Sequence, residues 1–132
     1  MGSPFLMAVP EHLQLHLEEG RALAAAGGYR GRFAPSPTGV LHLGNLQTAL
    51  LSWLAARQAG GIWLLRIDDL DTPRNRAGAI EAIQSDLLWL GLEWDGPVVL
   101  QSERRGIYHS WLSWLRRSGS LFACRCSRRE LA

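Results

Sequence analysis

The chain has 132 residues, of which 47% are hydrophobic and 20% charged, and its formal net charge is +2. These proportions are typical of a globular domain with a hydrophobic core, and they exclude a largely disordered chain. No apolar run approaches the roughly 18 residues that a membrane-spanning helix needs. The acidic residues within residues 1–28 also argue against a secretory or transit peptide. We therefore expect a soluble, cytoplasmic protein with no membrane partner.

Helices and strands are predicted to alternate along the chain. An amphipathic helix is predicted between Pro10 and Gly27, with proline near its start and glycine past its end. Short apolar runs predict strands at residues 32–34, 62–67, 98–100 and 121–124, and helical spacing of apolar residues predicts helices at 43–57, 80–90 and 102–118. A capping-box pattern at Ser127–Glu130 predicts the start of one more helix. The alternation indicates an α/β fold with a parallel sheet, whose ligand site lies at the carboxyl ends of the strands.

The loop after the first predicted strand has the features of an anion site. It runs from Pro35 into the next helix, and the first N–H groups of a helix attract anions. His42 and Asn45 are three residues apart and lie on one helix face, and Gly44 leaves room for the flat ring of a ligand. The spacing differs from GxGxxG and from GxxxxGK[ST], which disfavours a dehydrogenase or a P-loop ATPase. The sequence therefore predicts a nucleotide triphosphate site of another type.

At this loop the sequence resembles a known family. His42-Leu43-Gly44-Asn45 resembles the HIGH signature of class I aminoacyl-tRNA synthetases, and RFAPSPTG at residues 32–39 resembles the glutamate-specific branch. Four further segments continue the resemblance, at residues 65–71, 89–95, 101–104 and 124–126. Residues 29–31 and 71–74 look most like the glutamyl-Q-tRNA(Asp) synthetases, and the glutamyl-tRNA synthetases are the nearest alternative.

The resemblance implies a fold and an activity. The fold would be the first half of a Rossmann-like (HUP-type) class I synthetase domain, with a parallel sheet flanked by helices. The activity would be the activation of L-glutamate with ATP and Mg²⁺ to glutamyl-adenylate, followed by transfer to tRNA. In the glutamyl-Q type the acceptor is queuosine of tRNA(Asp), and in the other type it is the 3′ end of a tRNA.

The resemblance also implies roles for particular residues. The catalytic residues would be His42 and Asn45. The ATP-binding residues would be Thr38, Gly39, His42, Gly44 and Asn45, and the glutamate-binding residues would be Arg32, Phe33, Ala34, Pro35, Ser36 and Asp68. Two positions depart from the family: Asn45 stands where the signature ends in histidine, and Asp68 stands where the acidic motif usually has glutamate. Taken singly, Arg32 would more often be an exposed strand residue and His42 a helix cap.

The last part of the chain contains Cys124 and Cys126, which resemble half of the family's zinc site. Zinc needs four ligands in a closed tetrahedron, so two free thiols are the alternative. Residues 1–28 are predicted to be an N-terminal extension. Residues 29–132 are predicted to be a catalytic domain that stops before its second half, where the family carries a lysine-containing signature; this sequence has no lysine. The alternatives to an enzyme are an inactive module that binds ATP or glutamate, and a tRNA-binding fragment with arginine clusters.

Overall fold

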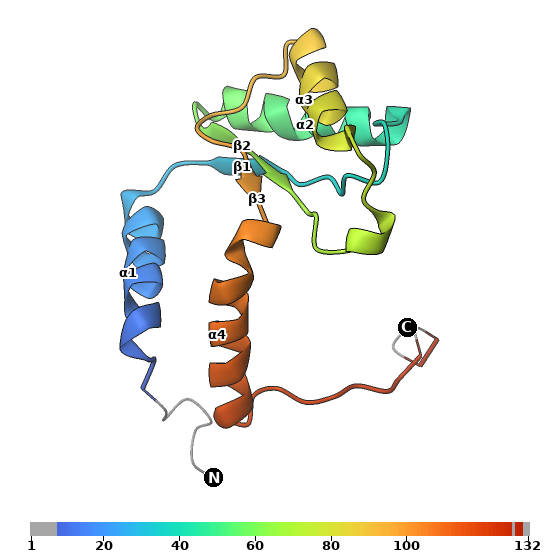
Figure 1. Cartoon of the computed structure of the whole chain (residues 1–132). Helices are drawn as coiled ribbons and strands as arrows, with labels where there is room; N and C mark the ends of the chain where they lie inside the picture. Colours follow the sequence, from blue (N-terminus) through green and yellow to red (C-terminus); the bar gives the residue numbers. More distant parts are fainter. Residues whose placement is uncertain (1–7, 128, 131–132) are drawn as a thin grey trace. The chain divides into compact units, whose positions relative to one another are not determined.

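The computed structural model of the chain describes residues 8–127 and 129–130 (Figure 1). These residues divide into two compact units. Residues 26–104 form the first unit, and the described residues before and after them form the second. Each unit is built around its own buried side chains.

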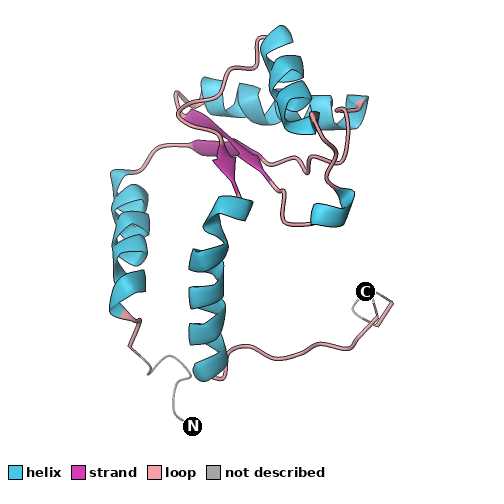
Figure 2. Cartoon of the chain, in the orientation of Figure 1, coloured by secondary structure: helices cyan, strands magenta, loops and turns pink. Residues whose placement is uncertain are grey.

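The first unit contains a three-stranded parallel sheet (Figure 2). Its strands are β1 (Arg30–Phe33), β2 (Ile62–Ile67) and β3 (Val99–Leu100), in the order β1-β2-β3. In the register of the first pair, Arg30 lies opposite Ile62. The parallel α/β sheet predicted from the sequence is thereby confirmed.

Two helices cover one side of this sheet (Figure 1). They are α2 (Leu43–Gln58) and α3 (Ala79–Trp89), which connect successive strands. Alternate residues of β2 point to them, because successive side chains of a strand face opposite sides. The buried core consists of Phe33, Ala49, Ala56, Trp63, Leu65, Ile67, Ile83, Leu87 and Leu92. Burial of each large side chain of this kind contributes about 1.5–3 kcal/mol.

The segments that follow β2 and β3 are joined by a buried carboxylate. Asp69 is only 7% exposed, and its two oxygens accept hydrogen bonds from the backbone N–H and the hydroxyl of Ser102, at 2.8 and 2.5 Å. The carbonyl of Asp69 accepts a further bond from the side-chain amide of Asn75 at 2.8 Å. Ser102 opens the short 3₁₀ helix η2 (Ser102–Arg104), and another, η1, spans Thr72–Arg74. These bonds fix the loop that leaves β2.

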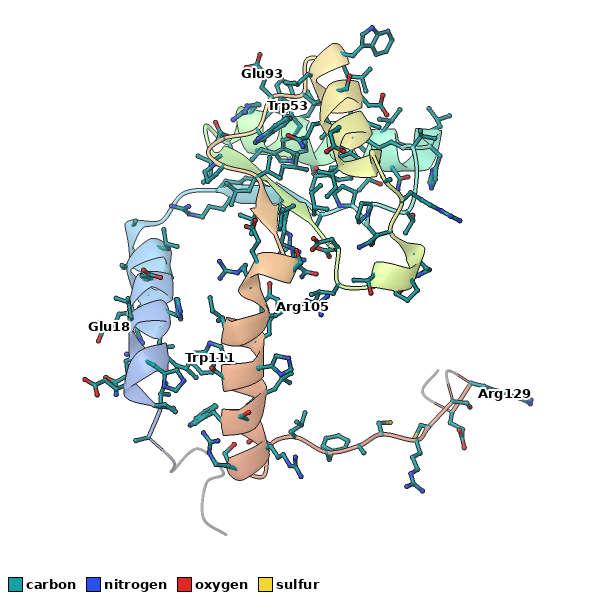
Figure 3. All side chains as sticks on the ribbon, viewed as in Figure 1. Glu18, Trp53, Glu93, Arg105, Trp111 and Arg129 are labelled. Carbon is teal, nitrogen blue, oxygen red and sulfur yellow. The ribbon has the colours of Figure 1, made fainter. Side chains whose placement is uncertain are left out.

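A second polar cluster ties the end of α2 to the segment before β3. Arg57 donates to the Asp95 carboxylate at 2.7 Å and to the Glu93 carbonyl at 2.8 Å. The same Asp95 oxygen accepts the backbone N–H of Trp63 at 2.7 Å. Trp53 donates its indole N–H to the Glu93 carbonyl at 3.0 Å, and the two residues lie next to each other in Figure 3. The hydrogen bond from Trp63, and then the one from Arg57, lower the pKa of Asp95.

We expect Asp95→Asn to lower the free energy of unfolding at neutral pH by about 1 kcal/mol, because the Asp95 side chain is 38% exposed and solvent screens the ion pair. A carboxylate whose pKa is lowered by folding stabilises the protein above its unfolded pKa, near pH 4, and loses that effect as the pH falls through the folded pKa. The difference between the two proteins should therefore shrink in acid. Urea unfolding across this pH range measures it. Asp71→Asn, in an exposed pair with Arg74, is the matched control and should change little.

The second unit contains the helices α1 (Glu11–Ala26) and α4 (Arg105–Arg117). Leu13 and Trp114 are its buried apolar side chains. The indole N–H of Trp114 donates to the carbonyl of Ala8 at 3.2 Å, which satisfies the polar atom of a buried ring. Among the helices that the structure describes, none combines the length and the apolar character needed to cross a bilayer.

Two predictions for the chain after residue 100 are corrected. The strand predicted at 121–124 is wrong: these residues are exposed, Phe122 by 82%, and they pair with no strand of the described chain. The helix predicted from Ser102 begins with η2, and α4 starts at Arg105. At Ser127–Glu130, the Glu130 carboxylate accepts the backbone N–H and the hydroxyl of Ser127, both at 2.7 Å, and the Glu130 N–H donates to the Ser127 carbonyl at 3.0 Å, so only one of the two bonds of a capping box is formed. Only a turn is described there, and residues 128 and 131–132 lie outside the described residues.

Candidate functional site

A cavity of about 450 Å³ lies where β1 leads into α2. Its walls come from the end of β1, from the loop after it and from the first turns of the helix. The lining residues are Arg32, Phe33, Ala34, Pro35, Ser36, Thr38, Gly39, Val40, Leu41, His42, Asn45 and Thr48. The site is therefore at the carboxyl end of a strand and at a helix N-terminus, as the sequence predicts for this sheet type.

The loop that forms the cavity wall is fixed by its prolines. Neither proline has an N–H, but both carbonyls accept backbone hydrogen bonds from the segment after β2. The Pro35 carbonyl accepts from Asp68 at 2.9 Å, and the Pro37 carbonyl accepts from Arg76 at 2.9 Å. Pro37 is also among the fully buried side chains. The loop is thus anchored on its inner side, and its outer side faces the cavity.

His42 caps the start of α2 and forms a reciprocal pair with Asn45. Its backbone is extended, with φ −100° and ψ 169°, as an N-cap requires. The Nδ1 atom of His42 accepts the backbone N–H of Asn45 at 3.4 Å, and the Asn45 Oδ1 atom accepts the backbone N–H of His42 at 3.3 Å. Both residues also line the cavity. The arrangement is a capping box made with histidine and asparagine.

Gly44 lies beside the cavity without lining it. A Cβ atom at this position would lie 3.2 Å from Cε1 and 3.3 Å from Nδ1 of the His42 ring. The absence of a side chain at Gly44 therefore makes room for the histidine ring itself. The Gly44 carbonyl accepts the hydroxyl of Thr48 at 2.9 Å, one helical turn further on.

Three lining residues were not predicted from the sequence. Val40 and Leu41 are apolar loop residues with no chemical signature. Thr48 had a signal that could have been used: it lies four residues after Gly44, so it shares a helix face with the signature. Its hydroxyl is occupied as a donor to Gly44 but retains acceptor capacity toward the cavity.

Arg32 provides a positive charge at the edge of the cavity. Its side chain is exposed, whereas the next residue, Phe33, is 6% exposed. Phe33 packs against Trp63 with parallel rings whose centroids are 6.1 Å apart. Because adjacent residues of a strand face opposite sides, the packing of Phe33 directs Arg32 away from the core. Ser36 is exposed on the same loop.

Asp68 does not line the cavity. Its two carboxylate oxygens accept hydrogen bonds from Arg66, at 2.7 and 3.0 Å, in a two-pronged ion pair. Residues two apart in an extended chain lie on the same side, which explains why this arginine reaches it. Asp71 is likewise paired, with Arg74 at 2.5 Å. The predicted role of Asp68 as a glutamate ligand stays a prediction.

The two cysteines lie in the second unit. Cys124 and Cys126 are both exposed and free. In the described part of the chain, no group of three or more potential metal ligands is brought together. The thiols thus offer two of the four ligands of a tetrahedral zinc site, and zinc stays a prediction of the resemblance.

The geometry of the cavity defines a chemical class of ligand. A parallel sheet with a cavity between its first strand and the next helix is the arrangement of Rossmann-like nucleotide-binding domains. The helix start provides hydrogen-bond donors for an anion, His42 contributes an imidazole ring, and Arg32 provides a cationic group at the same cavity. The site is therefore suited to a ligand with both a phosphate and a carboxylate.

Comparison with known proteins assigns the family. Residues 29–132 match the model of the catalytic domain of class I tRNA synthetases (E and Q). The chain belongs to this family, and its three parallel strands with flanking helices are a part of the Rossmann-like catalytic domain.

Individual relatives carry more specific names. The chain is 92% identical, over 96% of its length, to a glutamyl-Q tRNA(Asp) synthetase of Synechococcus sp. (strain CC9605), and 70% identical, over 95%, to one of Prochlorococcus marinus (strain MIT 9313). It covers 43% and 40% of those proteins. A crystal structure of a glutamate tRNA ligase from Elizabethkingia meningosepticum CCUG26117, in complex with its amino acid, superposes with a TM-score of 0.66 at 43% identity. That match covers 69% of this chain and 20% of the ligase. The chain thus spans about two fifths of the relatives named glutamyl-Q tRNA(Asp) synthetase.

Proposed function

We propose that the cavity between β1 and α2 binds L-glutamate and ATP, and that it belongs to an enzyme that joins them as glutamyl-adenylate for transfer to tRNA. The observation that carries this proposal is that Arg32 and His42 line the same cavity. Its volume of about 450 Å³ lies within the usual range of small-molecule sites. The name of the glutamate tRNA ligase that resembles this fold supports glutamate as the amino acid.

On the amino-acid side, Arg32 is the principal ligand. A guanidinium forms two parallel hydrogen bonds with a carboxylate, which gives direction as well as energy. Phe33, Ala34 and Pro35 contribute the wall next to it, and Ser36 contributes a hydroxyl. Asp68 would bind the ammonium group only after its carboxylate is released from Arg66 or shared with it.

On the nucleotide side, the start of α2 and His42 face the phosphates. Thr38, Gly39 and Asn45 also line the cavity. Mg²⁺ fits best as an ion that enters with the triphosphate and neutralises its charge. In the loop after β2, Asp68 and Asp71 are already paired with arginines, and the Asp69 carboxylate accepts two hydrogen bonds from Ser102.

The proposed reaction is an in-line displacement at the α-phosphorus. An oxygen of the glutamate α-carboxylate forms a bond to this phosphorus, the bond between the α-phosphorus and the bridging oxygen breaks, and pyrophosphate leaves with the electron pair. Charge then develops on phosphate oxygens, so fixed donors at their positions lower the barrier. The N–H groups at the start of α2 and the ring of His42 have this role, and Arg32 aligns the nucleophile.

For the acceptor we propose tRNA(Asp), with the glutamyl-Q type favoured over the glutamate–tRNA ligase type. The supporting observation is the identity of 92% to a relative named for tRNA(Asp), against 43% to the ligase. In domain terms, residues 29–132 are a part of the catalytic domain, and residues 1–28 are an extension. The cytoplasm, where aminoacylation substrates occur, is the proposed compartment.

An inactive module that binds glutamate or ATP is the second candidate. One observation favours it: the Asp68 carboxylate, which is predicted to bind glutamate, is already paired with Arg66. It would share the cavity and the ligands with the enzyme, but not the chemical step.

Glutamate-dependent ATP–pyrophosphate exchange separates these two candidates. We expect the folded chain to bind both ligands by calorimetry. Exchange that requires glutamate would establish adenylation by these residues alone. Binding of both ligands without exchange would assign this chain the binding role, and a folded chain that binds neither would contradict the proposed function.

A further inference from the structure

The His42 ring is held from two sides by its own helix. On one side its Nδ1 atom accepts the backbone N–H of Asn45, and Asn45 returns a hydrogen bond to the His42 backbone. On the other side the ring lies so close to Gly44 that a Cβ there would be 3.2 Å from Cε1. That separation is shorter than an ordinary van der Waals contact between carbon atoms. A side chain at position 44 would therefore require the His42 ring to shift by a few tenths of an ångström.

We propose that Gly44 and Asn45 are positioning residues that hold His42 in one tautomer, with Nδ1 as acceptor and Nε2–H as the donor offered to a phosphate oxygen. The inference rests on the proposed ATP-binding role of the cavity. It differs from the expectation drawn from the sequence, in which Gly44 makes room for the ligand and Asn45 contacts it directly.

The tautomer follows from the chemistry of the donor. A backbone N–H can only donate, so the Nδ1 atom that faces it must carry a lone pair and no proton. A neutral imidazole then carries its single proton on Nε2. The Nε2 atom makes no hydrogen bond to a described residue, and His42 lines the cavity. Nε2–H is therefore the polar group that this ring can offer to a ligand.

Asn45 is restricted in the same way. Its Oδ1 atom is occupied by the His42 backbone N–H, so only its amide hydrogens remain for a ligand. The short side chain of asparagine can reach the backbone N–H of His42. Unlike the histidine that the family signature has at this position, asparagine cannot carry a positive charge. The asparagine thus acts on the ligand mainly through His42.

The test is the tautomer of His42, measured by NMR of the full chain with ¹⁵N-labelled histidine and assigned with His42→Gln. We expect unprotonated Nδ1 and protonated Nε2 in the wild-type chain without ligand, whereas exposed His12 should show a mixture. Gly44→Ala should convert His42 to a mixture and weaken MgATP binding about tenfold. Gly106→Ala is the matched control, because Gly106 is also the second residue of its helix and its added Cβ meets nothing within 4 Å.

Different results would contradict the positioning of His42 and the proposed function of the cavity. A proton on Nδ1, or a mixture like that of His12, in a wild-type chain that binds MgATP would contradict the positioning role. A single Nε2–H tautomer in a chain that does not bind MgATP would contradict the proposed function. If Gly44→Ala does not fold, Asn45→Asp is the alternative variant for the tautomer measurement, because aspartate keeps the Oδ1 acceptor. It should preserve the tautomer, and a mixture in this variant would also count against the inference.

Discussion

The chain with His42 replaced by asparagine should fold as stably as the wild type and bind MgATP about tenfold more weakly or worse. Asparagine is a strong N-cap residue, and its Oδ1 atom takes the place of Nδ1 in the bond to the Asn45 backbone. The variant has no group at the position of Nε2, so it loses the donor that we assign to the phosphate. If the wild-type chain catalyses glutamate-dependent ATP–pyrophosphate exchange, we expect the rate of exchange in this variant to fall by about 10²-fold, the usual cost of removing one transition-state donor.

The complementary change is His42→Gln. Its amide nitrogen reaches the position of Nε2, but the side chain has no atom at the position of Nδ1, so the cap is lost. We expect this variant to lose about 1 kcal/mol of unfolding free energy and to retain more MgATP affinity than His42→Asn. Thermal unfolding and calorimetry measure the two properties separately. If His42→Asn were both more stable and tighter in MgATP binding than His42→Gln, His42 would act only as a helix cap.

Arg32→Gln should weaken glutamate binding by about 10- to 100-fold, because a charged hydrogen-bond pair to a carboxylate is worth about 1.5–3 kcal/mol. MgATP binding should not change, since the helix start and His42 stay intact. Arg32 is exposed, so the free energy of unfolding should change by less than about 0.5 kcal/mol. Calorimetric titration with each ligand tests both statements.

Arg32→Lys is the matched comparison. It keeps the charge but not the planar pair of donors, so its glutamate affinity should lie between those of the wild type and Arg32→Gln. Equal glutamate affinity in all three proteins would show that Arg32 is a solvated strand residue and that the carboxylate binds elsewhere.

The sheet and its two covering helices were predictable because their apolar patterns are regular. The run at residues 62–67 predicted β2 with its observed bounds, and the spacing from residue 43 predicted α2 to within one residue. Residues 121–124 show the limit of such patterns. Four apolar residues in a row fit a strand, but a strand also needs a neighbour with free hydrogen-bonding groups, and the sequence alone does not supply that information.

The site was predictable in its location and less so in its internal contacts. The proline-containing loop and the helix start were identified from residue types, and all but Gly44 and Asp68 of the predicted ligand-binding residues line the cavity. The contact of Gly44 with His42 depends on the path of the backbone and on a ring orientation, which spacing does not encode. The pairing of Asp68 with Arg66 likewise depends on a competition between partners that only the structure reveals.

The most direct test of the account is calorimetric titration of the chain with a non-hydrolysable analogue of glutamyl-adenylate, which carries both halves of the proposed ligand. We predict one binding site per chain, affinity about tenfold weaker or worse in both Arg32→Gln and His42→Asn, and no change in Asp95→Asn. If the folded wild-type chain does not bind the analogue, or if both cavity variants bind it as tightly as the wild type, this cavity is not a glutamyl-adenylate site.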